Sequence, residues 1–449
     1  MNEIFELQNP WRQPGYSFPS EKVILRNLLA SLKESLVSPE ISVVIGARQV
    51  GKTFLLRQLI RSLIENEGSD RRQIFYFNLD SFQLLPFVQN LPEFIRFIEA
   101  WGAPQKTSYV FLDEAQRLPN CGLTLKQYYD LGRPIKFIVS GSSALEIKSQ
   151  VRESLVGRKR IFHLRPVSFT EAAAFWGFDF ASMSFERLYF ENDKALYWLE
   201  RFLRYGGYPA VVREEDERQR ERLLSEIYQS YVHKDIGDFL KVEDVAGFNR
   251  LVAQLTGGTA QLLNVNELSK VARLSRYFVD KYLQMLRDTY VIDLLLPYFS
   301  NIGKAVVKTP KLFFADLGLR NSIQYQSQIP MTLTEAGHLA ENFVFTEISN
   351  ASPAANLWFW RTQQGTETDF VYQAGGEITP IEVKFHEAET AAVPKALRSF
   401  AEAHNLSRAI VLTKRRWDEK KDEKLIVRFL PVWMASRIPE LLEMQKLVS

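Results

Sequence analysis

The sequence is poor in cysteine and histidine. Its 449 residues include a single cysteine, Cys121. One cysteine excludes a disulfide framework within the chain and a zinc site built from cysteines, and it suits a reducing cytosol. The five histidines have no metal-binding spacing, and no elbow motif points to a Ser/His/Asp hydrolase. They are His163, His233, His338, His386 and His404.

The sequence also lacks long apolar runs and a strong net charge. No uncharged apolar stretch reaches about 18 residues, so we expect no membrane span and no membrane partner. The first residues, Met1 to Phe5, are not a basic segment followed by an apolar core, so we expect no signal peptide and a cytoplasmic protein. The net charge is +3, and any nucleic-acid footprint must therefore be local.

Size and composition are those of an ordinary globular protein. Hydrophobic residues make up 46% and charged residues 24% of the chain, as in most globular proteins. A chain of this length usually folds as two or three domains. We see neither an internal repeat nor a low-complexity segment.

One motif, Gly46-Ala47-Arg48-Gln49-Val50-Gly51-Lys52-Thr53, has the spacing G-x-x-x-x-G-K-T. An apolar run, 41–45, precedes it and predicts a buried parallel strand, and 54–60 follows with helical spacing. This context predicts a P-loop that binds ATP, with Lys52 on the β- and γ-phosphates and Thr53 on Mg²⁺. The expected nucleotide-binding residues are Gly46, Arg48, Gln49, Val50, Gly51, Lys52, Thr53 and Phe54. The alternative is a glycine turn that binds nothing.

Two acids end a later apolar run. After strands expected at 73–79 and 108–112, with a helix at 92–101 between them, come Asp113 and Glu114. Asp113 is expected to hold Mg²⁺ beside Thr53, and Glu114 to orient and deprotonate the attacking water. The alternative is that the pair only caps the next helix.

Further candidates lie on either side of this core. Ser140, after the expected strand 136–139, could sense the γ-phosphate, whereas Ser142 and Ser143 could cap a helix. Arg158 could stabilise transition-state charge in a neighbouring subunit or simply be a solvated surface residue. The N-terminal Pro10, Trp11, Pro14 and Tyr16 precede an amphipathic helix expected at 23–36. These aromatics could pack on adenine or cover the edge of the sheet.

The motifs GARQVGKT, FLDEAQR, VSGSS, LRPVSFTE and Gly206-Gly207-Tyr208-Pro209 occur in this order. Over residues from about 26 to about 414, the chain resembles the archaeal-type ATPases of the AAA-like superclass, which also occur in bacteria. The resemblance implies an α-helical lid and a nucleotide-dependent homo-oligomer, for which a hexamer is one form. It also implies that the turn with Pro209 borders the adenine. Otherwise that turn is an ordinary helix-ending loop.

The central part of the chain is mainly helical. Helices expected at 169–176, 196–205 and 217–240 fit the lid, and Arg213 to Arg222 is most simply a solvated face. Helices expected at 265–272 and 276–286, with a strand at 290–296, predict a winged helix-turn-helix. Its second helix offers side chains for DNA, unless the module serves only for packing. These side chains are Arg276, Lys281, Gln284 and Arg287.

The C-terminal third carries a second set of charged residues. Glu341 lies on a helix expected at 336–348, Asp369 on a strand at 367–372, and Glu382 and Lys384 on a strand at 378–384. Alternate strand residues share a face, so Glu382 and Lys384 point the same way. The three acids could bind Mg²⁺, with Lys384 near an attacking water.

The order Glu…Asp…Glu-x-Lys resembles the PD-(D/E)xK nucleases, with Thr368 where the usual proline stands. The alternative is a nuclease-like fold kept for docking or DNA holding, without turnover. A helix at 394–404 and a strand at 408–412 would complete the α/β layer. Trp358, Phe359 and Trp360 are expected in its core.

Together these patterns predict an α/β protein with four parts. They are a P-loop ATPase core with a parallel sheet (1–168), a helical lid (169–244), a winged helix (245–325) and a nuclease-like domain (326–449). We expect an ATPase that uses ATP and Mg²⁺ and acts on DNA, with branched or junction DNA as candidates. The alternatives are a nucleotide switch that assembles with protein partners and an ATP-gated, Mg²⁺-dependent nuclease.

Overall fold

A computed structural model describes residues 2–141, 155–232, 244–299, 309–324, 333–386 and 392–446. The chain divides into two compact units. The first comprises residues 1–166 and 288–290, and the second comprises 167–287 and 291–449. The first unit covers most of the range expected for the core, and the ranges expected for the other three parts fall mainly in the second unit. No helix of the described residues is long and apolar enough to cross a membrane.

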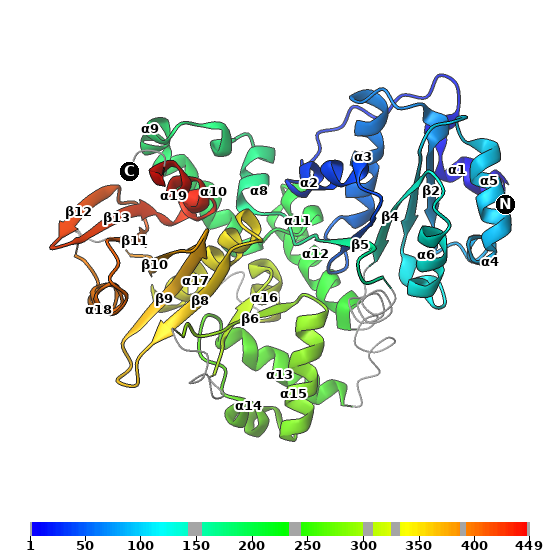
Figure 1. Cartoon of the computed structure of the whole chain (residues 1–449). Helices are drawn as coiled ribbons and strands as arrows, with labels where there is room; N and C mark the ends of the chain where they lie inside the picture. Colours follow the sequence, from blue (N-terminus) through cyan, green and yellow to red (C-terminus); the bar gives the residue numbers. More distant parts are fainter. Residues whose placement is uncertain are drawn as a thin grey trace. The chain divides into compact units, whose positions relative to one another are not determined.

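The first unit is a parallel sheet with helices on both faces (Figure 1). The strand order is β2-β3-β4-β1-β5, and every neighbouring pair is parallel. The strands are β1 (Ile41–Ile45), β2 (Ile74–Asn78), β3 (Ser108–Asp113), β4 (Ile135–Gly141) and β5 (Lys159–His163). The helices are α1 (Asn2–Gln8), α2 (Leu28–Glu34), α3 (Lys52–Glu65), α4 (Leu84–Gln89), α5 (Leu91–Trp101) and α6 (Cys121–Asp130). The parallel sheet expected for a P-loop core is confirmed.

The order of the strands positions the chemistry. β4 lies between β1 and β3, so the motif after β1 and the acids after β3 meet at the carboxyl edge of the same sheet. All five residues of β1 are buried, as expected for a strand covered on both faces. Phe5, Phe77 and Phe97 belong to the core on one face. Cys121 is buried in this core as a free thiol.

The N-terminal segment departs from the prediction. The helix expected at 23–36 begins only at Leu28, because the residues before it use their polar groups elsewhere. The carbonyl of Ile24 accepts a hydrogen bond from Gln58, and the Arg26 side chain reaches the P-loop. Trp11 is buried and packs edge-to-face on Tyr76 of the edge strand β2. This packing supports the prediction that the N-terminal aromatics cover the sheet edge.

The second unit begins with helices. They are α8 (Phe169–Phe175), α9 (Phe185–Leu188), α10 (Asn192–Tyr205), α11 (Pro209–Arg213) and α12 (Glu217–Ser230). The helix expected at 217–240 ends at Ser230, and 233–243 lie outside the described residues. Then follow α13 (Val245–Gly257), α14 (Val265–Ala272), α15 (Arg276–Asp288) and an antiparallel pair, β6 (Ile292–Leu295) with β7 (Lys311–Phe314). The two expected helices are therefore joined by the three-residue turn 273–275.

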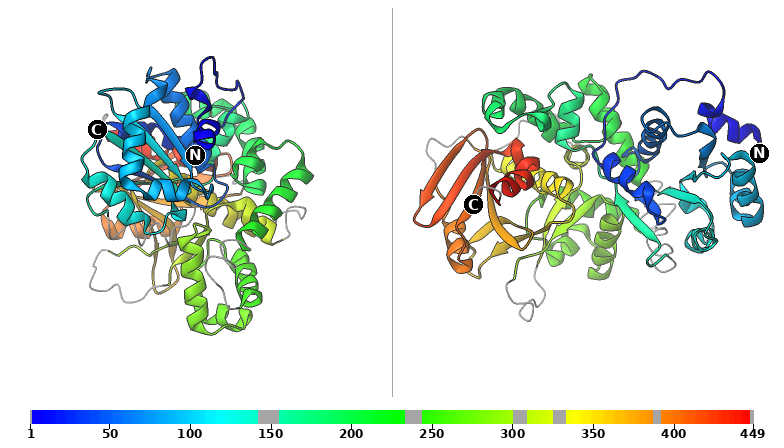
Figure 2. Two further views of the ribbon diagram at one scale, coloured as in Figure 1. Left: turned by 90° about the vertical axis from the view of Figure 1, so that its right-hand side faces the viewer. Right: turned by 45° about the horizontal axis from the view of Figure 1, so that its top comes forward.

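A six-stranded mixed sheet ends the chain, in the order β12-β13-β11-β10-β9-β8. The elements are α16 (Leu317–Ile323), α17 (Leu333–Ala351), β8 (Asn356–Arg361), β9 (Glu367–Ala374), β10 (Glu377–Lys384), α18 (Lys395–His404), β11 (Arg408–Thr413), β12 (Asp418–Asp422), β13 (Leu425–Pro431) and α19 (Ile438–Lys446). In Figure 2 the yellow α17 and red α19 lie beside the orange sheet, and α17 contacts both β10 and α19. Phe359 is buried in this layer, whereas Trp358 and Trp360 are half-buried and pack on Tyr298 and Phe400.

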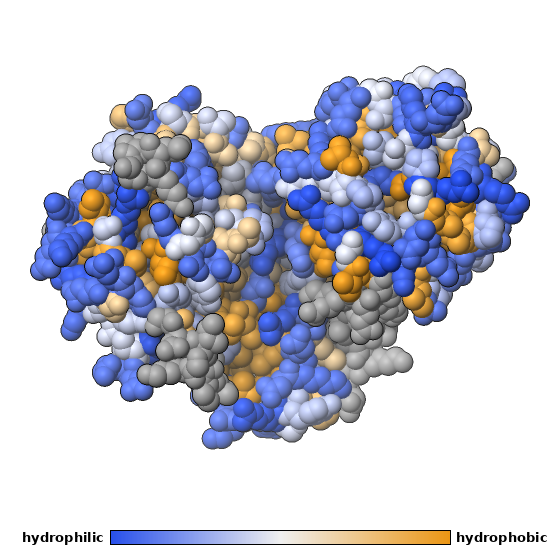
Figure 3. All heavy atoms as spheres, viewed as in Figure 1, coloured by the Kyte–Doolittle hydropathy of each residue, from blue (hydrophilic) through white to orange (hydrophobic). Residues whose placement is uncertain are grey.

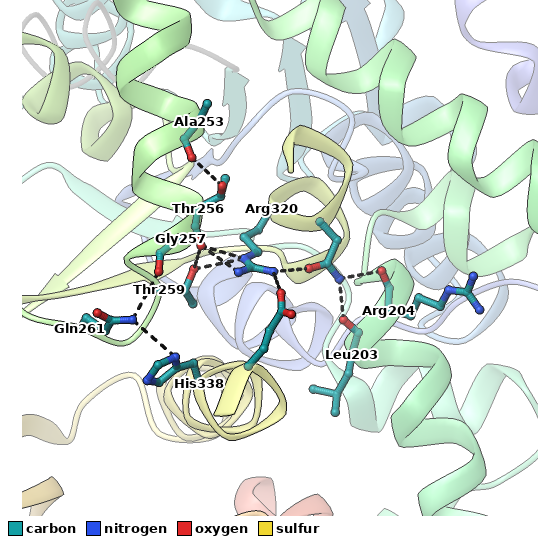
Figure 4. A network of polar contacts seen from close by, with 11 residues as sticks. Leu203, Arg204, Ala253, Thr256, Gly257, Thr259, Gln261, Arg320 and His338 are labelled. Carbon is teal, nitrogen blue, oxygen red and sulfur yellow. Dashed lines mark hydrogen bonds and ion pairs between the residues drawn. The ribbon is translucent and has the colours of Figure 1, made fainter. Parts of the chain in front are cut away.

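Arg320 joins several helices of the second unit (Figure 4). Its guanidinium donates to the carbonyl of Thr256 at 2.9 and 3.0 Å, and to Glu335 at 3.0 Å. The neighbouring Asn321 donates to the carbonyls of Leu203 and Arg204 at the end of α10. Because buried polar groups are costly without partners, this network fixes α10, α13, α16 and α17 against one another.

The Gly206–Gly207 turn has a packing role within the second unit. Gly206 has φ +70°, and a Cβ there would lie 2.4 Å from an Asp316 oxygen. A Cβ on Gly207 would lie 2.0 Å from the carbonyl oxygen of Val167. Asp316 also accepts a 2.6 Å hydrogen bond from the Gly207 amide. Close packing therefore explains both glycines, and an adenine contact at Pro209 stays a prediction.

Candidate functional site

The loop between β1 and α3 has the backbone expected of a P-loop. Gly51 has φ +95°, and Gln49 also lies in the left-handed region with φ 60°. A Cβ on Gly46 would lie 2.1 Å from the carbonyl oxygen of Leu164. Glycine is therefore required at both ends of the loop, at one for conformation and at the other for space.

Lys52 is the first residue of α3 and is 5% exposed. Its Nζ donates to the carbonyl oxygens of Gly46 at 3.0 Å and Ala47 at 2.7 Å. The ammonium group is thereby held over the loop whose amides precede α3. A lysine charge, loop amides and a helix N-terminus together favour the binding of a phosphate group.

Asp113 lies at the centre of the site and is fully buried. Its Oδ2 accepts hydrogen bonds from Thr53 Oγ1 at 2.6 Å and from the Tyr76 hydroxyl at 2.7 Å. Its Oδ1 accepts from the Ser140 hydroxyl and from the Glu114 amide, the latter at 3.2 Å. Residues from β2, β3, β4 and α3 therefore converge on one carboxylate. Thr53 and Asp113 supply adjacent hard oxygen atoms, which fit Mg²⁺.

Glu114 is held in a strained conformation next to this carboxylate. It is not glycine, yet its φ is 56°, a left-handed conformation that costs about 1–2 kcal/mol. Its carboxylate accepts a hydrogen bond from Gln116 Nε2. Strain of this kind gathers at functional sites because it aims a side chain. Glu114 is the N-cap residue of the turn 115–117, but its side chain makes no capping hydrogen bond there, which does not favour the helix-cap alternative.

Comparisons with known proteins agree with this geometry. Residues 38–173 match the family model described as an AAA domain. This region therefore resembles an AAA domain and has the parallel sheet of a P-loop core. Residues 197–329 and 336–434 match two further models, each described as a domain of unknown function (DUF8612 and DUF4143).

Relatives occur in bacteria and archaea. An uncharacterized protein of Haemophilus influenzae is 26% identical over 370 residues, covering 81% of this chain and 87% of its own. One of Methanocaldococcus jannaschii is 23% identical, covering 92% and 94%. Among solved structures, a Walker-type ATPase of Pyrococcus abyssi aligns with a TM-score of 0.44 at 16% identity, covering 70% of this chain and 99% of its own. The ORC2 protein of Aeropyrum pernix aligns with a TM-score of 0.36 at 15% identity, covering 71% and 97%.

Other predicted residues of the ATPase domain have clear positions. Ser140 is buried at the end of β4 and contacts Asp113, and its sensor role stays a prediction. Arg158 pairs with Asp130 of its own chain at 2.8 Å. This pair favours the surface interpretation, and a role at a neighbouring subunit stays a prediction. Ser142 and Ser143 lie outside the described residues.

Two residues of the ATPase site were not predicted. Arg26 is buried and donates to the carbonyls of Val50 at 2.8 Å and Arg165 at 2.6 Å, so it braces the P-loop. Tyr76 donates to Asp113, and burial, followed by the Asp113 charge, raises the pKa of the Tyr76 phenol. No local pattern marks Arg26. Tyr76 could have been noticed as a polar aromatic residue within an apolar strand.

The acids expected to bind Mg²⁺ in the C-terminal unit lie close to a lysine. Over the described ranges, no three acidic, histidine or cysteine side chains are arranged to hold a metal. Instead, Lys311 Nζ lies 2.7 Å from Glu341 Oε1, 2.5 Å from Glu367 Oε1 and 3.7 Å from Asp369 Oδ1. A lysine therefore lies among these carboxylates, and metal binding by Glu341, Asp369 and Glu382 stays a prediction.

The remaining members of the cluster form a second pair. Lys384 Nζ lies 2.7 Å from Glu382 Oε1, which confirms that these two side chains share a face of β10. Burial and then Asp369 raise the pKa of Glu382 to about 7. Burial lowers the pKa of Lys311, but Glu341, Asp369 and Glu367 outweigh it and raise the pKa above its usual value. The amino group is therefore charged.

The residues predicted to contact DNA lie along α15. Arg276, Gln284 and Arg287 are exposed, and Lys281 is half-buried. Arg276 lies 3.8 Å from Asp280, and Arg287 donates to Gln284 at 3.5 Å. In Figure 3 the atoms over the lower ends of α14 and α15 are mostly hydrophilic. The helix thus presents a polar face with two exposed arginines.

Proposed function

We propose that this chain binds and hydrolyses ATP and uses the hydrolysis to act on DNA through its second unit. The observation that carries the ATPase half is the position of Asp113, which contacts Thr53, Ser140 and the amide of Glu114 at once. A P-loop threonine and a strand-end acid within hydrogen-bond distance form the usual seat of Mg²⁺ in such enzymes.

The roles follow from the geometry. The loop amides and Lys52 would bind the phosphates, and Thr53 and Asp113 would hold Mg²⁺. When bound, Mg²⁺ supplies charge neutralisation on the phosphate oxygens. Glu114 would rotate away from Gln116 to orient the attacking water and take its proton. The hydroxyl of Ser140, which donates to Asp113, would move when the Asp113 carboxylate moves.

ATP turnover with and without Mg²⁺ tests this half directly. Lys52→Ala is expected to abolish productive nucleotide binding, because it removes the only charge on the loop-to-helix junction that the motif reserves for the phosphates. Lys106→Ala is the matched control, since Lys106 is exposed on the loop before β3. Equal turnover by the two variants would contradict the ATPase proposal.

The DNA half is supported by the polar face of α15. These arginines lie on α15, the last of the three helices α13 to α15 that the antiparallel pair β6–β7 follows. This order of elements is the one expected for a winged helix, whose last helix contacts DNA. Arg276→Ala combined with Arg287→Ala is expected to weaken DNA binding and to reduce its salt dependence, because phosphate contacts release counterions. The control is the double variant Lys420→Ala/Lys421→Ala, which removes two positive charges from the exposed strand β12 instead of from α15.

Binding and ATP turnover measured with duplex, single-stranded and four-way junction DNA distinguish action on DNA from the nucleotide-switch hypothesis. Stimulated ATP turnover and binding that the α15 double variant loses would support action on DNA. No binding at low salt and no stimulation would favour a nucleotide switch that assembles with protein partners instead.

A further inference from the structure

Lys311 occupies the middle of the C-terminal carboxylate cluster, although it belongs to a different module. It lies on β7, the second strand of the antiparallel pair that follows α15. The three carboxylates around its Nζ come from α17 and β9. The lysine side chain is 3% exposed, so solvent contributes little to the balance of charge.

The strand that carries Lys311 is fixed against α17. The Asn342 side chain accepts from the Phe314 amide at 2.7 Å and donates to the Phe314 carbonyl at 2.8 Å, as a neighbouring strand would. The ring of Phe313 stacks on Phe345 with centroids 4.3 Å apart. These contacts fix the backbone of β7 against α17, and with it the position from which the Lys311 side chain extends.

The positive charge of Lys311 compensates the negative charge of the carboxylates around it. A buried carboxylate is stable only when it is paired or bonded, and Glu341 has Lys311 as its ion-pair partner. Asp369 uses its other oxygen to accept from the Val383 amide at 2.8 Å. Glu382 pairs with Lys384 instead, with Nζ and Oε1 2.7 Å apart.

We propose that Lys311 replaces a metal ion in this cluster, so that the C-terminal sheet binds no divalent cation there and does not cut DNA. The same lysine joins the β6–β7 pair to α17 and β9. The C-terminal sheet then serves to fix the β6–β7 pair and the helices α13 to α15 that precede it. This inference is independent of the ATPase site, which lies in the other unit.

Mn²⁺ binding to the full-length chain without nucleotide tests the proposal. The number of Mn²⁺ ions bound, measured by electron paramagnetic resonance, is expected to be the same for the unsubstituted protein and for Asp369→Asn. A Mn²⁺ ion that the Asp369→Asn variant loses would overturn the proposal. So would Mg²⁺-dependent DNA cleavage that Asp369→Asn or Lys384→Ala abolishes.

Lys311→Met gives a second, positive test. The change leaves the carboxylates without their cation, so the melting temperature should fall and Mn²⁺ should raise it again. Mn²⁺ should not do so for Lys395→Met, which removes an exposed lysine from α18, nor for the double variant Lys311→Met/Asp369→Asn. A folded Lys311→Met protein that is indifferent to Mn²⁺ would contradict the replacement of a metal by Lys311. If this variant does not fold, the comparison with Asp369→Asn decides alone.

Discussion

Thr53 Oγ1 donates a 2.6 Å hydrogen bond to Asp113 Oδ2, across 60 positions of sequence. The bond joins the start of α3 to the end of β3, and it forms because the intervening β4 places both ends at one edge of the sheet. Two hard oxygens at this distance can share a cation. The relationship therefore links the fold of the first unit to its chemistry.

The first prediction concerns the cation. Asp113→Asn should lower the apparent affinity for Mg²⁺ in ATP hydrolysis by about 10–100-fold, as loss of a metal-supporting carboxylate generally does. Thr53→Ser keeps the hydroxyl and should retain most of the turnover. Turnover measured against free Mg²⁺ checks both variants. An unchanged Mg²⁺ dependence in Asp113→Asn would show that the carboxylate has only a structural role.

The second prediction separates binding from hydrolysis. Glu114→Gln should bind ATP normally and hydrolyse it about 10²–10⁴-fold more slowly, because an amide cannot accept the proton of the attacking water. Gln116→Ala, which removes a hydrogen-bond donor to the Glu114 carboxylate, should have a much smaller effect on turnover. Fluorescent-nucleotide titration and single-turnover hydrolysis measure the two steps. Parallel losses of affinity and rate would contradict this assignment of Glu114.

The ATPase site could largely be predicted from sequence, because its residues lie in contiguous patterns. A glycine-bounded loop after an apolar run predicts both the strand and the phosphate contacts of Lys52. Two acids directly after a second apolar run predict the positions of Asp113 and Glu114. These patterns work because each side chain is positioned by the strand or helix on which it lies.

The residues that were missed owe their positions to tertiary contacts. Arg26 donates to the carbonyl of Arg165, 139 positions away, and backbone carbonyls leave no trace in sequence. Lys311 comes from a short strand before α17, so the spacing of Glu341, Asp369 and Glu382 gave no sign of it. For the same reason the C-terminal motif predicted a metal where the structure has an amino group.

The third prediction concerns Arg26 as a positioning residue. Arg26→Ala should destabilise the first unit by about 1.5–3 kcal/mol, because a charged donor to two buried carbonyls is lost. It should also raise the KM for ATP, since the loop around Val50 is then less well fixed. Arg61→Ala is the control, because Arg61 is a half-buried arginine of α3 that pairs with Glu65 near the surface and should cost less than about 1 kcal/mol. Chemical unfolding and steady-state kinetics check both. Equal effects of the two variants would contradict the role of Arg26 in positioning the P-loop.

The last prediction is a pH dependence of stability that arises at Glu347. This α17 residue is 1% exposed, accepts a 2.8 Å hydrogen bond from the Phe169 amide, and has a second oxygen without a partner. Burial raises the pKa of Glu347 from 4.5 to about 8. The folded state therefore holds the proton more tightly than the unfolded state does, and the associated stability is complete below pH 4.5.

This stability should be lost progressively as the pH rises to about 8, where the buried carboxylate ionises. Glu347→Gln keeps the oxygen that accepts from Phe169 but cannot ionise, so its melting temperature should fall less over this range. Glu402→Gln, at an exposed position of α18, should follow the unsubstituted protein. Differential scanning calorimetry of the three proteins between pH 5 and 9, with ionic strength held constant, isolates the effect of the one carboxylate, since all other titrating groups are shared. Parallel curves for the unsubstituted protein and Glu347→Gln would show that Glu347 does not titrate in this range.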